Sequence, residues 1–312
     1  MMDTALTRAG KKRLKPGVRL FLGILPFIVA YAVFCYLPLT GWRYAFYDYK
    51  PGRQLSDCTF VGFRYFTSMF QNPVSRRELF RVLRNTVVMS SLNYLTSFLP
   101  MFLAILLNEV KNRRCRKFVQ TVTTIPNFIS WILVFAMATA MFSVESGAVN
   151  RMLREFGIID KGLNILGTSD HVWLFMLLLQ IWKGLGWSSV IYMAAINGID
   201  QELYEAVAID GGNRFQKIRY ITIPGLLPTY VTLLIIGLGN FLNMGMEQFL
   251  VFQNAFNKDK VEILSLYTYN VGLVGNNISR GTAIGMMQSV IALLLLCTTN
   301  AVSGKVRDEK VF

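Results

Sequence analysis

The sequence contains few charged residues and many apolar ones. Only 16% of its 312 residues are charged, whereas 53% are hydrophobic, and the mean hydropathy is +0.42. Soluble domains usually carry about a quarter charged residues, so this composition predicts a membrane protein. The formal net charge of +14 comes from short basic segments between apolar runs. Because these segments do not form one compact basic face, the charge argues against nucleic-acid binding.

Residues that hold metal ions or carry out catalysis are also scarce. There is one histidine, and the cysteines lie far apart without a CxxC spacing: Cys35, Cys58, Cys115 and Cys297. This pattern predicts neither a zinc site nor a disulfide framework. The chain lacks the GxxxxGK[ST] motif that cradles nucleotide phosphates, and it offers no Ser-His-Asp grouping. We therefore expect no catalytic residue, metal site or cofactor in this chain.

Six apolar runs are each long enough to cross a bilayer core, which takes about 20 residues. They cover residues 20–39, 86–107, 119–142, 172–196, 225–246 and 281–302. Five contain no charged residue, and the run 172–196 contains only Lys183. No small-residue cleavage site follows the first run, so we interpret it as a retained membrane helix and not as a signal peptide. The segment RRELFRVLR (76–84) predicts an interfacial amphipathic helix that leads into the second run.

Lysine and arginine residues near the ends of the runs indicate the orientation. They concentrate in the N-terminal tail, in the 108–117 segment, after the fourth run and in the C-terminal tail, all on one side of a six-span chain. We expect this side to be cytoplasmic, with segments 143–171 and 247–280 outside. The predicted organisation is a tail 1–17, a transmembrane domain 18–304 that includes a cytoplasmic loop 197–224, and a tail 305–312.

The polar stretch EAVAIDGGNRFQKIRYITIP (205–224) lies between the fourth and fifth runs. Asp200 suits a helix N-cap, and the following QELYEAVAI predicts about two helical turns. Gly211 and Gly212 then end that helix, because glycine adopts the left-handed conformation of a tight C-terminal turn. Residues 214–220 predict a second short helix, which Pro224 ends where the fifth run begins. The loop is therefore expected to form a helix-turn-helix rigidly joined to two spans.

The residues of this loop resemble the cytoplasmic signature of binding-protein-dependent ABC importer permeases. That signature reads Glu-Ala-Ala, three residues, Gly, nine residues, Ile, one residue, Leu-Pro. The corresponding positions here are Glu205, Ala206, Val207, Gly211, Ile221, Ile223 and Pro224. Val207 and Ile223 are mild departures. Residues 16–305 are similar to maltose-type sugar permeases, most of all to the branch for complex and acidic oligosaccharides such as aldouronate, polygalacturonan and alginate.

The resemblance implies an all-α membrane protein with six transmembrane helices, the type I ABC importer permease fold and a cytoplasmic coupling-helix loop. It implies oligosaccharide import across a bacterial cytoplasmic membrane, with both termini cytoplasmic. The implied partners are a second homologous permease, two ATPase subunits that bind ATP and Mg, and an extracytoplasmic solute-binding protein. The implied coupling residues are Glu205, Ala206, Asp210, Gly211, Ile221 and Pro224. The alternative is an ion-coupled secondary sugar transporter, but the six runs contain no acidic residue that would support it.

A sugar pathway needs polar and aromatic side chains that face a central cavity. The candidates are Gln180, Trp182, Lys183, Trp187, Asn240, Asn243, Glu247 and Gln288. For the uncharged candidates, packing or hydrogen bonding between helices is an equal or stronger alternative, and Glu247 is expected at the outer mouth. Lys183 is open to three interpretations: an ion pair or carbonyl contact, a path residue that favours an anionic sugar, or a snorkelling or backbone role.

Overall fold

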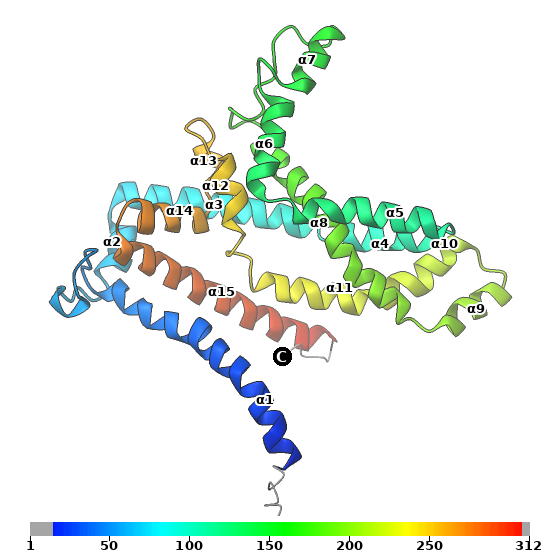
Figure 1. Cartoon of the computed structure of the whole chain (residues 1–312), viewed down its shortest axis with the longest axis horizontal. Helices are drawn as coiled ribbons and strands as arrows, with labels where there is room; N and C mark the ends of the chain where they lie inside the picture. The colour runs from blue at the N-terminus through cyan, green and yellow to red at the C-terminus, as the bar shows by residue number, and fades with distance from the viewer. Residues whose placement is uncertain (1–14, 308–312) are drawn as a thin grey trace, which may run out of the picture.

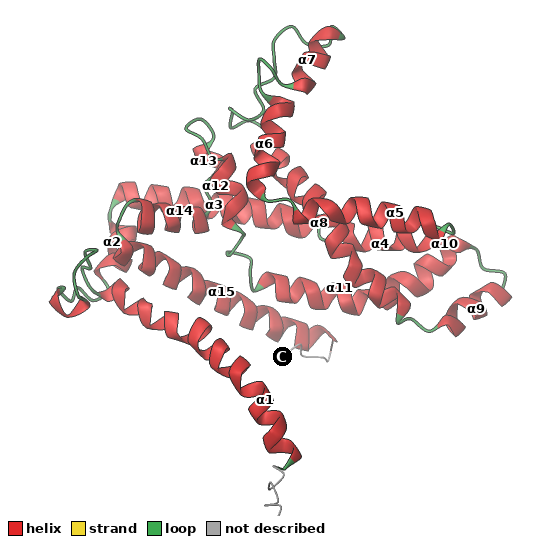
Figure 2. Ribbon diagram, viewed as in Figure 1, coloured by secondary structure: helices red, strands yellow, loops and turns green. Residues whose placement is uncertain are grey.

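The computed structural model describes residues 15–307, and within that range the chain is helical with no named β-strand (Figure 2). The tail segments 1–14 and 308–312 lie outside the described residues. The longer helices are α1 (Pro16–Tyr31), α3 (Pro73–Leu95), α4 (Leu99–Glu109), α5 (Arg113–Thr124), α6 (Trp131–Phe142), α8 (Val172–Asn197), α11 (Ile223–Leu238) and α15 (Ile278–Arg307). The shorter ones are α2 (Arg64–Gln71), α7 (Ala148–Glu155), α9 (Gln201–Ile209), α10 (Arg214–Lys217), α12 (Met246–Phe252), α13 (Lys258–Val261) and α14 (Leu264–Tyr269).

Five helical stretches of the described chain are long and apolar enough to cross a membrane. They are Leu20–Phe46, Pro73–Glu109, Val172–Asn197, Arg214–Leu238 and Ile278–Asn300. A sixth forms if the bent pair Arg113–Phe128 and Trp131–Phe142 is counted as one span. The structure therefore contains a helical stretch for each of the six predicted runs, but two of them differ from the prediction.

The run 119–142 is not one continuous helix, because the pair Arg113–Phe128 and Trp131–Phe142 bends by 103°. Helix α5 ends at Thr124, the short turn η4 (Ile125–Phe128) follows, and α6 begins at Trp131. Pro126 lies in this turn and has no N–H, so it cannot continue the backbone hydrogen-bond ladder. Ser130 then caps the new helix by accepting a hydrogen bond from the Leu133 N–H at 3.4 Å.

The fifth span also differs from the predicted 225–246. Helix α10 continues through a π-helical turn (Ile218–Thr222) directly into α11, so Pro224 does not end a helix but lies in the first turn of α11. The wider π turn accommodates the missing proline N–H. The helix then ends at Leu238, and residues 239–245 are irregular. Asn240 and Asn243 therefore lie on a connecting segment and not on a helical span.

The segment 76–84 is not a separate interfacial helix. It forms the first half of α3, which runs without interruption to Leu95. Asn72 caps this helix by accepting hydrogen bonds from the N–H groups of Val74 and Ser75. Arg81, within the segment, pairs with the buried Glu262 at 2.5 Å. One face of this half of α3 therefore packs against the protein, with Leu79 and Val82 buried.

Most of the long helices run roughly side by side and leave two distinct ends, whereas α6 stands upright from them (Figure 1). Helices α9 and α10 form one, which we name the loop end; α2, α13, α14 and the start of α15 lie toward the other, which we name the opposite end. Buried side chains from α4, α8 and α11 pack into one cluster: Ala104, Ile105, Tyr192, Ile196 and Leu226. Helix α1 leans away from this bundle, and its most apolar 18-residue window has no buried residue.

Candidate functional site

The predicted helix-turn-helix is present at the loop end. Asp200 caps α9 and accepts a hydrogen bond from the Glu202 N–H at 3.0 Å. Gly211 has a φ of +74°, which is the left-handed conformation expected for the turn. The Gly212 N–H donates to the Val207 carbonyl at 2.8 Å and closes the turn. The local structure of this loop therefore follows from its sequence.

Helix α10 begins with a capping box that the sequence reasoning missed. The Asn213 Oδ1 accepts from the Gln216 N–H at 2.9 Å, and the Gln216 side chain accepts from the Asn213 N–H at 2.7 Å. The spacing Asn-x-x-Gln directly after the two glycines is the sequence signal for this cap. The cap allows a helix to restart immediately after the turn.

Two side-chain contacts attach the loop to the spans. The Arg214 guanidinium pairs with the Glu109 carboxylate at the end of α4, at 2.6 Å. The hydroxyls of Tyr204 and Thr222 lie 3.0 Å apart and join α9 to the stem of α11. Ile221 is 8% exposed and anchors the same stem. A force on the loop is therefore passed directly to α4 and α11.

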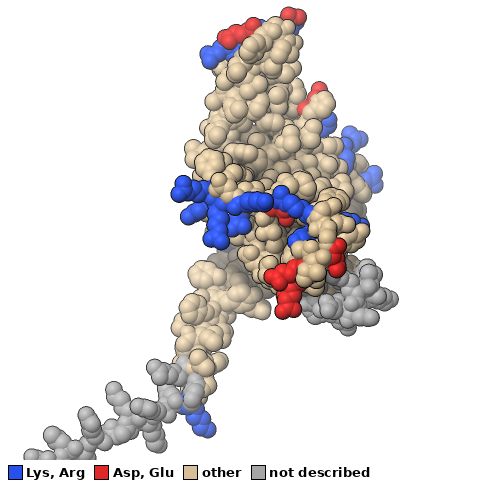
Figure 3. Space-filling view, turned by 90° about the vertical axis from the view of Figure 1, so that its right-hand side faces the viewer, with Lys and Arg blue, Asp and Glu red and all other residues tan. Residues whose placement is uncertain are grey.

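The rest of the loop is exposed. Glu205, Ala206 and Asp210 are on the surface, and Pro224 is also exposed. Four large apolar side chains around the turn are exposed as well: Leu203, Ile209, Phe215 and Tyr220. The view of the loop end shows Lys and Arg in a band apart from a group of Asp and Glu (Figure 3). Exposed apolar groups rimmed by charges are typical of a surface that another protein covers.

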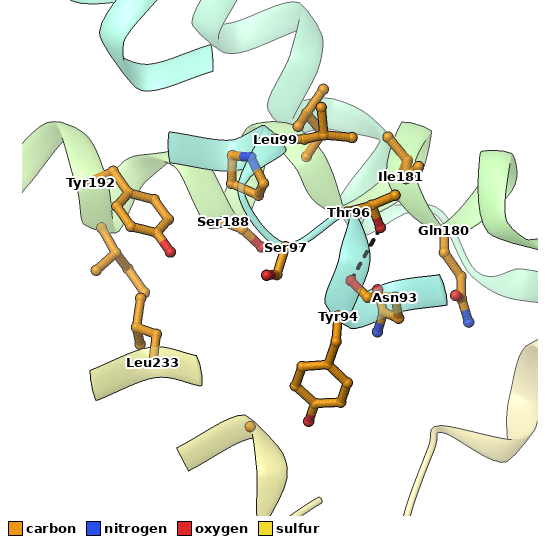
Figure 4. Close-up of a pocket in the computed structure, with 15 residues that line it drawn as sticks. Asn93, Tyr94, Thr96, Ser97, Leu99, Gln180, Ile181, Ser188, Tyr192 and Leu233 are labelled. Carbon is orange, nitrogen blue, oxygen red and sulfur yellow. Dashed lines mark hydrogen bonds between the residues drawn. The ribbon is translucent and has the colours of Figure 1, made fainter. Parts of the chain in front are cut away.

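A cavity of about 350 Å³ lies between α3, α4, α8 and α11 (Figure 4). No charged side chain lines it. The lining residues are polar or apolar: Asn93, Tyr94, Thr96, Ser97, Leu99, Pro100, Gln180, Ile181, Gly184, Leu185, Ser188, Ile191, Tyr192, Leu233 and Gly237. We name it the central cavity. The break between α3 and α4 supplies two of the polar groups, Thr96 and Ser97, because the helix stops at Leu95 and restarts at Leu99.

The polar groups of the central cavity are only partly satisfied within the chain. The Gln180 Oε1 is buried and has no hydrogen-bond partner. The Ser97 and Tyr230 hydroxyls lie 3.0 Å apart, and the Tyr94 ring stacks on Phe241 with centroids 5.5 Å apart. A buried amide oxygen without a partner is costly, so this cavity is suited to a ligand that donates hydrogen bonds.

The structure places one predicted path residue, Gln180, in the central cavity. Trp182 and Trp187 are 42% and 52% exposed and do not line it. Asn240, Asn243 and Glu247 are exposed on or beside the irregular segment after α11. Gln288 is buried and donates from Nε2 to the Leu242 carbonyl at 2.7 Å. The path roles of these residues stay predictions.

Lys183 contacts backbone carbonyls at the bend of the third span. Its Nζ lies 2.6 Å from the Asn127 carbonyl oxygen and 3.4 Å from that of Pro126. It also lies 5.5 Å from the centre of the Trp131 ring. This geometry agrees with the carbonyl-contact interpretation, since the carbonyls at the end of a helical turn carry partial negative charge. Lys183 thus stabilises the bend between α5 and α6.

The two glycines beside Lys183 have different surroundings. A Cβ on Gly186 would collide with the Thr123 backbone, so α5 and α8 pack there in direct backbone contact. A Cβ on Gly184 would meet nothing within 4 Å, and this residue lines the central cavity. Gly186 is therefore required for helix packing, whereas Gly184 leaves space in the cavity.

Several cavity residues were not identified from the sequence, namely Asn93, Tyr94, Ser97, Ser188 and Tyr192. The signal for the first three was the polar cluster NYLTS just before Pro100, inside a run that otherwise reads as apolar. A proline breaks the helix ahead of it and frees nearby backbone and side-chain groups. Ser188 and Tyr192 carry no local signal beyond their position on the same helix as Gln180.

The chain matches known transport proteins along most of its length. Residues 97–307 match the family described as binding-protein-dependent transport system inner membrane component. Protein LplB of Bacillus subtilis (strain 168) is 34% identical over 316 residues, covering 99% of this chain and 98% of that protein. The polygalacturonan/rhamnogalacturonan transport system permease protein YteP of the same strain is 34% identical over 294 residues, covering 94% and 90%.

Solved structures show the same fold. A chain of a bacterial ABC transporter involved in the import of the acidic polysaccharide alginate has a TM-score of 0.83 and 32% identity, covering 93% of this chain and 96% of that one. A chain of the bacterial alginate transporter in complex with an alginate pentasaccharide-bound periplasmic protein gives 0.83 and 31% identity, covering 94% and 96%. The predicted type I importer permease fold is thereby confirmed. The chain belongs to the family of binding-protein-dependent transport system inner membrane components and is a permease subunit of a sugar ABC transporter.

Proposed function

We propose that this chain forms half of the membrane pathway of an ATP-driven importer for acidic oligosaccharides. The other half is a second homologous permease, two ATPase subunits bind ATP and Mg, and a solute-binding protein delivers the sugar. The central cavity carries this proposal, because it offers an unpaired amide oxygen, hydroxyls and aromatic edges without any charged side chain. These groups are suited to the hydroxyls and ring faces of a sugar.

The acidic class of the sugar is supported by the relatives and not by the cavity. YteP is named for polygalacturonan and rhamnogalacturonan transport, and the structural matches come from an alginate importer. Lys183 does not support an anionic ligand, because its ammonium group already contacts two carbonyls. The family match also leaves the ion-coupled alternative without support.

The loop end is the proposed docking site for the ATPase, and we therefore place it in the cytoplasm. Glu205 and Ala206 are exposed on α9, and the turn at Gly211 presents apolar side chains on both sides. The contacts from Arg214 to α4 and from Tyr204 to the stem of α11 make the loop a lever on two spans. Alternating access requires a rigid-body link of this kind.

Substitution at Gln180 tests the transport proposal. In the assembled complex, we expect Gln180→Met to reduce uptake of an oligogalacturonate about tenfold, because the variant loses one of the few hydrogen-bonding groups of the cavity. Gln120→Met is the control, since it makes the same change on α5 outside the cavity. Assembly and basal ATPase activity should stay at the wild-type level. Uptake by Gln180→Met equal to that of the control would contradict the assignment of the cavity.

A further inference from the structure

A second polar cavity, of about 240 Å³, lies at the opposite end. It is lined by the segment before α2, by α2, by the start of α3 and by the start of α15. Its lining residues are Asp48, Arg64, Tyr65, Ser68, Asn72, Ser75, Asn277 and Arg280. All eight are polar or charged, which distinguishes this cavity from the largely apolar surface of the spans. Nothing in the proposed transport pathway uses these residues.

The walls of this cavity are fixed by contacts between distant segments. Ser279, which is fully buried at the start of α15, accepts from the Tyr49 N–H at 3.0 Å and donates to the Tyr47 carbonyl at 2.7 Å. The Tyr65 hydroxyl donates to Asp48 at 2.7 Å. Residues of the first loop are thereby held against α2 and α15. The cavity is a preformed feature and not a gap in a loose loop.

The lining side chains carry two positive charges, on Arg64 and Arg280, and one negative charge, on Asp48, so the cavity has a net positive charge. Asp48 already accepts from Tyr65, and burial together with the Asp48 charge raises the pKa of Tyr65 to about 12, so this donor keeps its proton. Neither Arg64 nor Arg280 forms an ion pair with any described residue. The Arg280 Nε is buried and has no hydrogen-bond partner.

The surroundings of Arg280 and the start of α15 also bear on the charge of this cavity. The Arg280 Nη2 donates to the Tyr267 hydroxyl at 3.3 Å, and this hydroxyl donates to the Glu78 carboxylate at 3.2 Å. The Asn277 side-chain Oδ1 accepts from the Arg280 backbone N–H at 3.1 Å. The first turn of α15 contains no acidic residue, so no carboxylate in that turn offsets the partial positive charge of the helix start. Guanidinium groups in such a setting select a carboxylate, which they bind with charge-assisted hydrogen bonds.

We propose that this cavity is a socket for one carboxylate, supplied by an aspartate or glutamate side chain of the solute-binding protein when that protein docks. The proposal rests on the function proposed above, in which the binding protein approaches the end of the permease opposite the ATPase. A volume of about 240 Å³ is smaller than the roughly 300–1,000 Å³ of ordinary ligand pockets, so it suits a side chain better than an oligosaccharide. One acidic side chain in the socket would fix the register of the docked protein.

The test measures binding of the purified, sugar-loaded binding protein of the same importer to the complete transporter in nanodiscs. We expect Arg280→Gln to raise the dissociation constant about tenfold or more, because the docked carboxylate loses its buried partner. Arg64→Gln should raise it about threefold, since this side chain is exposed and screened by solvent. Arg64→Gln guards against a folding artefact, because its guanidinium forms no hydrogen bond or ion pair with any described residue. Binding should also weaken at high ionic strength.

Arg76→Gln is the matched control, because Arg76 is exposed on α3 at the same end but does not line the socket. Dissociation constants of Arg280→Gln and Arg64→Gln equal to that of the control overturn the socket, while wild-type binding still supports the importer. Absence of binding to the wild-type complex overturns the proposed function and the socket with it. If free digalacturonate binds the complex and Arg280→Gln abolishes that binding, the ligand is a sugar carboxylate and the assignment to a protein side chain is wrong.

Discussion

The two ends of the molecule are held together in different ways. At the opposite end, Glu262 is 1% exposed and is held by Arg81, by Lys258 and by the Asn270 amide. At the loop end, the ion pair of Arg214 and Glu109 is largely solvent-exposed, with side chains 63% and 29% accessible. Buried charges lose much stability when a partner is removed, whereas exposed pairs contribute little. The opposite end is therefore a platform fixed by buried charges, whereas the loop end is a lever whose stability depends little on its ion pair.

The opposite end owes this rigidity to more than one ion pair. The Asn85 side chain donates to the carbonyls of Asp259 and Glu262, at 2.8 and 3.0 Å. The buried Thr86 hydroxyl accepts from the Leu264 N–H at 2.8 Å. These bonds link α3 to the segment from α13 to α14, far apart in sequence. If a partner binds at the fixed opposite end and the ATPase moves the loop end, the spans between them would transmit that motion.

The largest effect is expected from Glu262→Ala. This substitution removes a buried carboxylate and leaves the partly buried Arg81 with only the exposed Asp259, which costs up to about 3–5 kcal/mol of unfolding free energy. The melting temperature of the purified subunit or complex should fall by many degrees. Asp259→Asn is the control, because the Asp259 side chain is 86% exposed and lies 3.7 Å from Arg81. Equal melting temperatures for the two variants would remove the distinction between the two ends.

Lys183→Met, at the bend between α5 and α6, should lower the free energy of unfolding less than Glu262→Ala does. The Asn127 and Pro126 carbonyls lose a charged donor, at a cost of about 1–3 kcal/mol. Part of this cost is offset because a lysine is removed from the membrane. We expect a lower melting temperature and equally reduced uptake of neutral and acidic oligosaccharides, with recovery in Lys183→Arg. A selective loss of acidic sugar uptake would restore the path interpretation of Lys183.

Gly211→Val should change stability little and transport strongly. A β-branched residue at a φ of +74° is strained by roughly 1–2 kcal/mol, and the exposed turn relieves this strain by changing its shape. We expect uptake to fall at least tenfold, with the subunit still in the membrane and its melting temperature nearly unchanged. Gly211→Asn is the matched control, since asparagine tolerates the left-handed conformation. Normal uptake by Gly211→Val would contradict the lever role of the loop.

The loop could be predicted from sequence because its determinants are local. Asp200 and Gly211 act on neighbouring backbone groups, and both act as their types predict. The central cavity could not be predicted, because Ser97 lies in the break after α3 while Gln180 and Gly237 lie on α8 and α11, and the relative rotation of these helices depends on the whole bundle. Periodicity does not give that rotation when a helix is apolar on every side.

The bend in the third span shows an intermediate case. Pro126 was visible in the sequence, but proline is tolerated inside membrane helices, so it did not by itself predict a 103° turn. The partner of Lys183 was equally ambiguous from sequence, because a carboxylate on another chain and a carbonyl at a helix end would both satisfy it. The contact between the Lys183 ammonium and the Asn127 carbonyl identifies the partner of the lysine and shows that this partner lies at the bend.

The smallest effect on stability is expected from Arg214→Gln at the loop end. The pair with Glu109 is exposed, and such pairs usually contribute less than about 1 kcal/mol. The Arg214 side chain also donates to the Glu109 backbone carbonyl, at 2.6 Å, so Glu109→Gln alone leaves part of the attachment in place. A double-mutant cycle of Arg214→Gln and Glu109→Gln, read by thermal unfolding, should give a coupling energy below about 1 kcal/mol. Uptake should fall only severalfold, because the contact between Tyr204 and Thr222 still joins the loop to α11. A coupling energy of about 3 kcal/mol would mean that the loop is held as firmly as the Glu262 network, and the distinction between platform and lever would not stand.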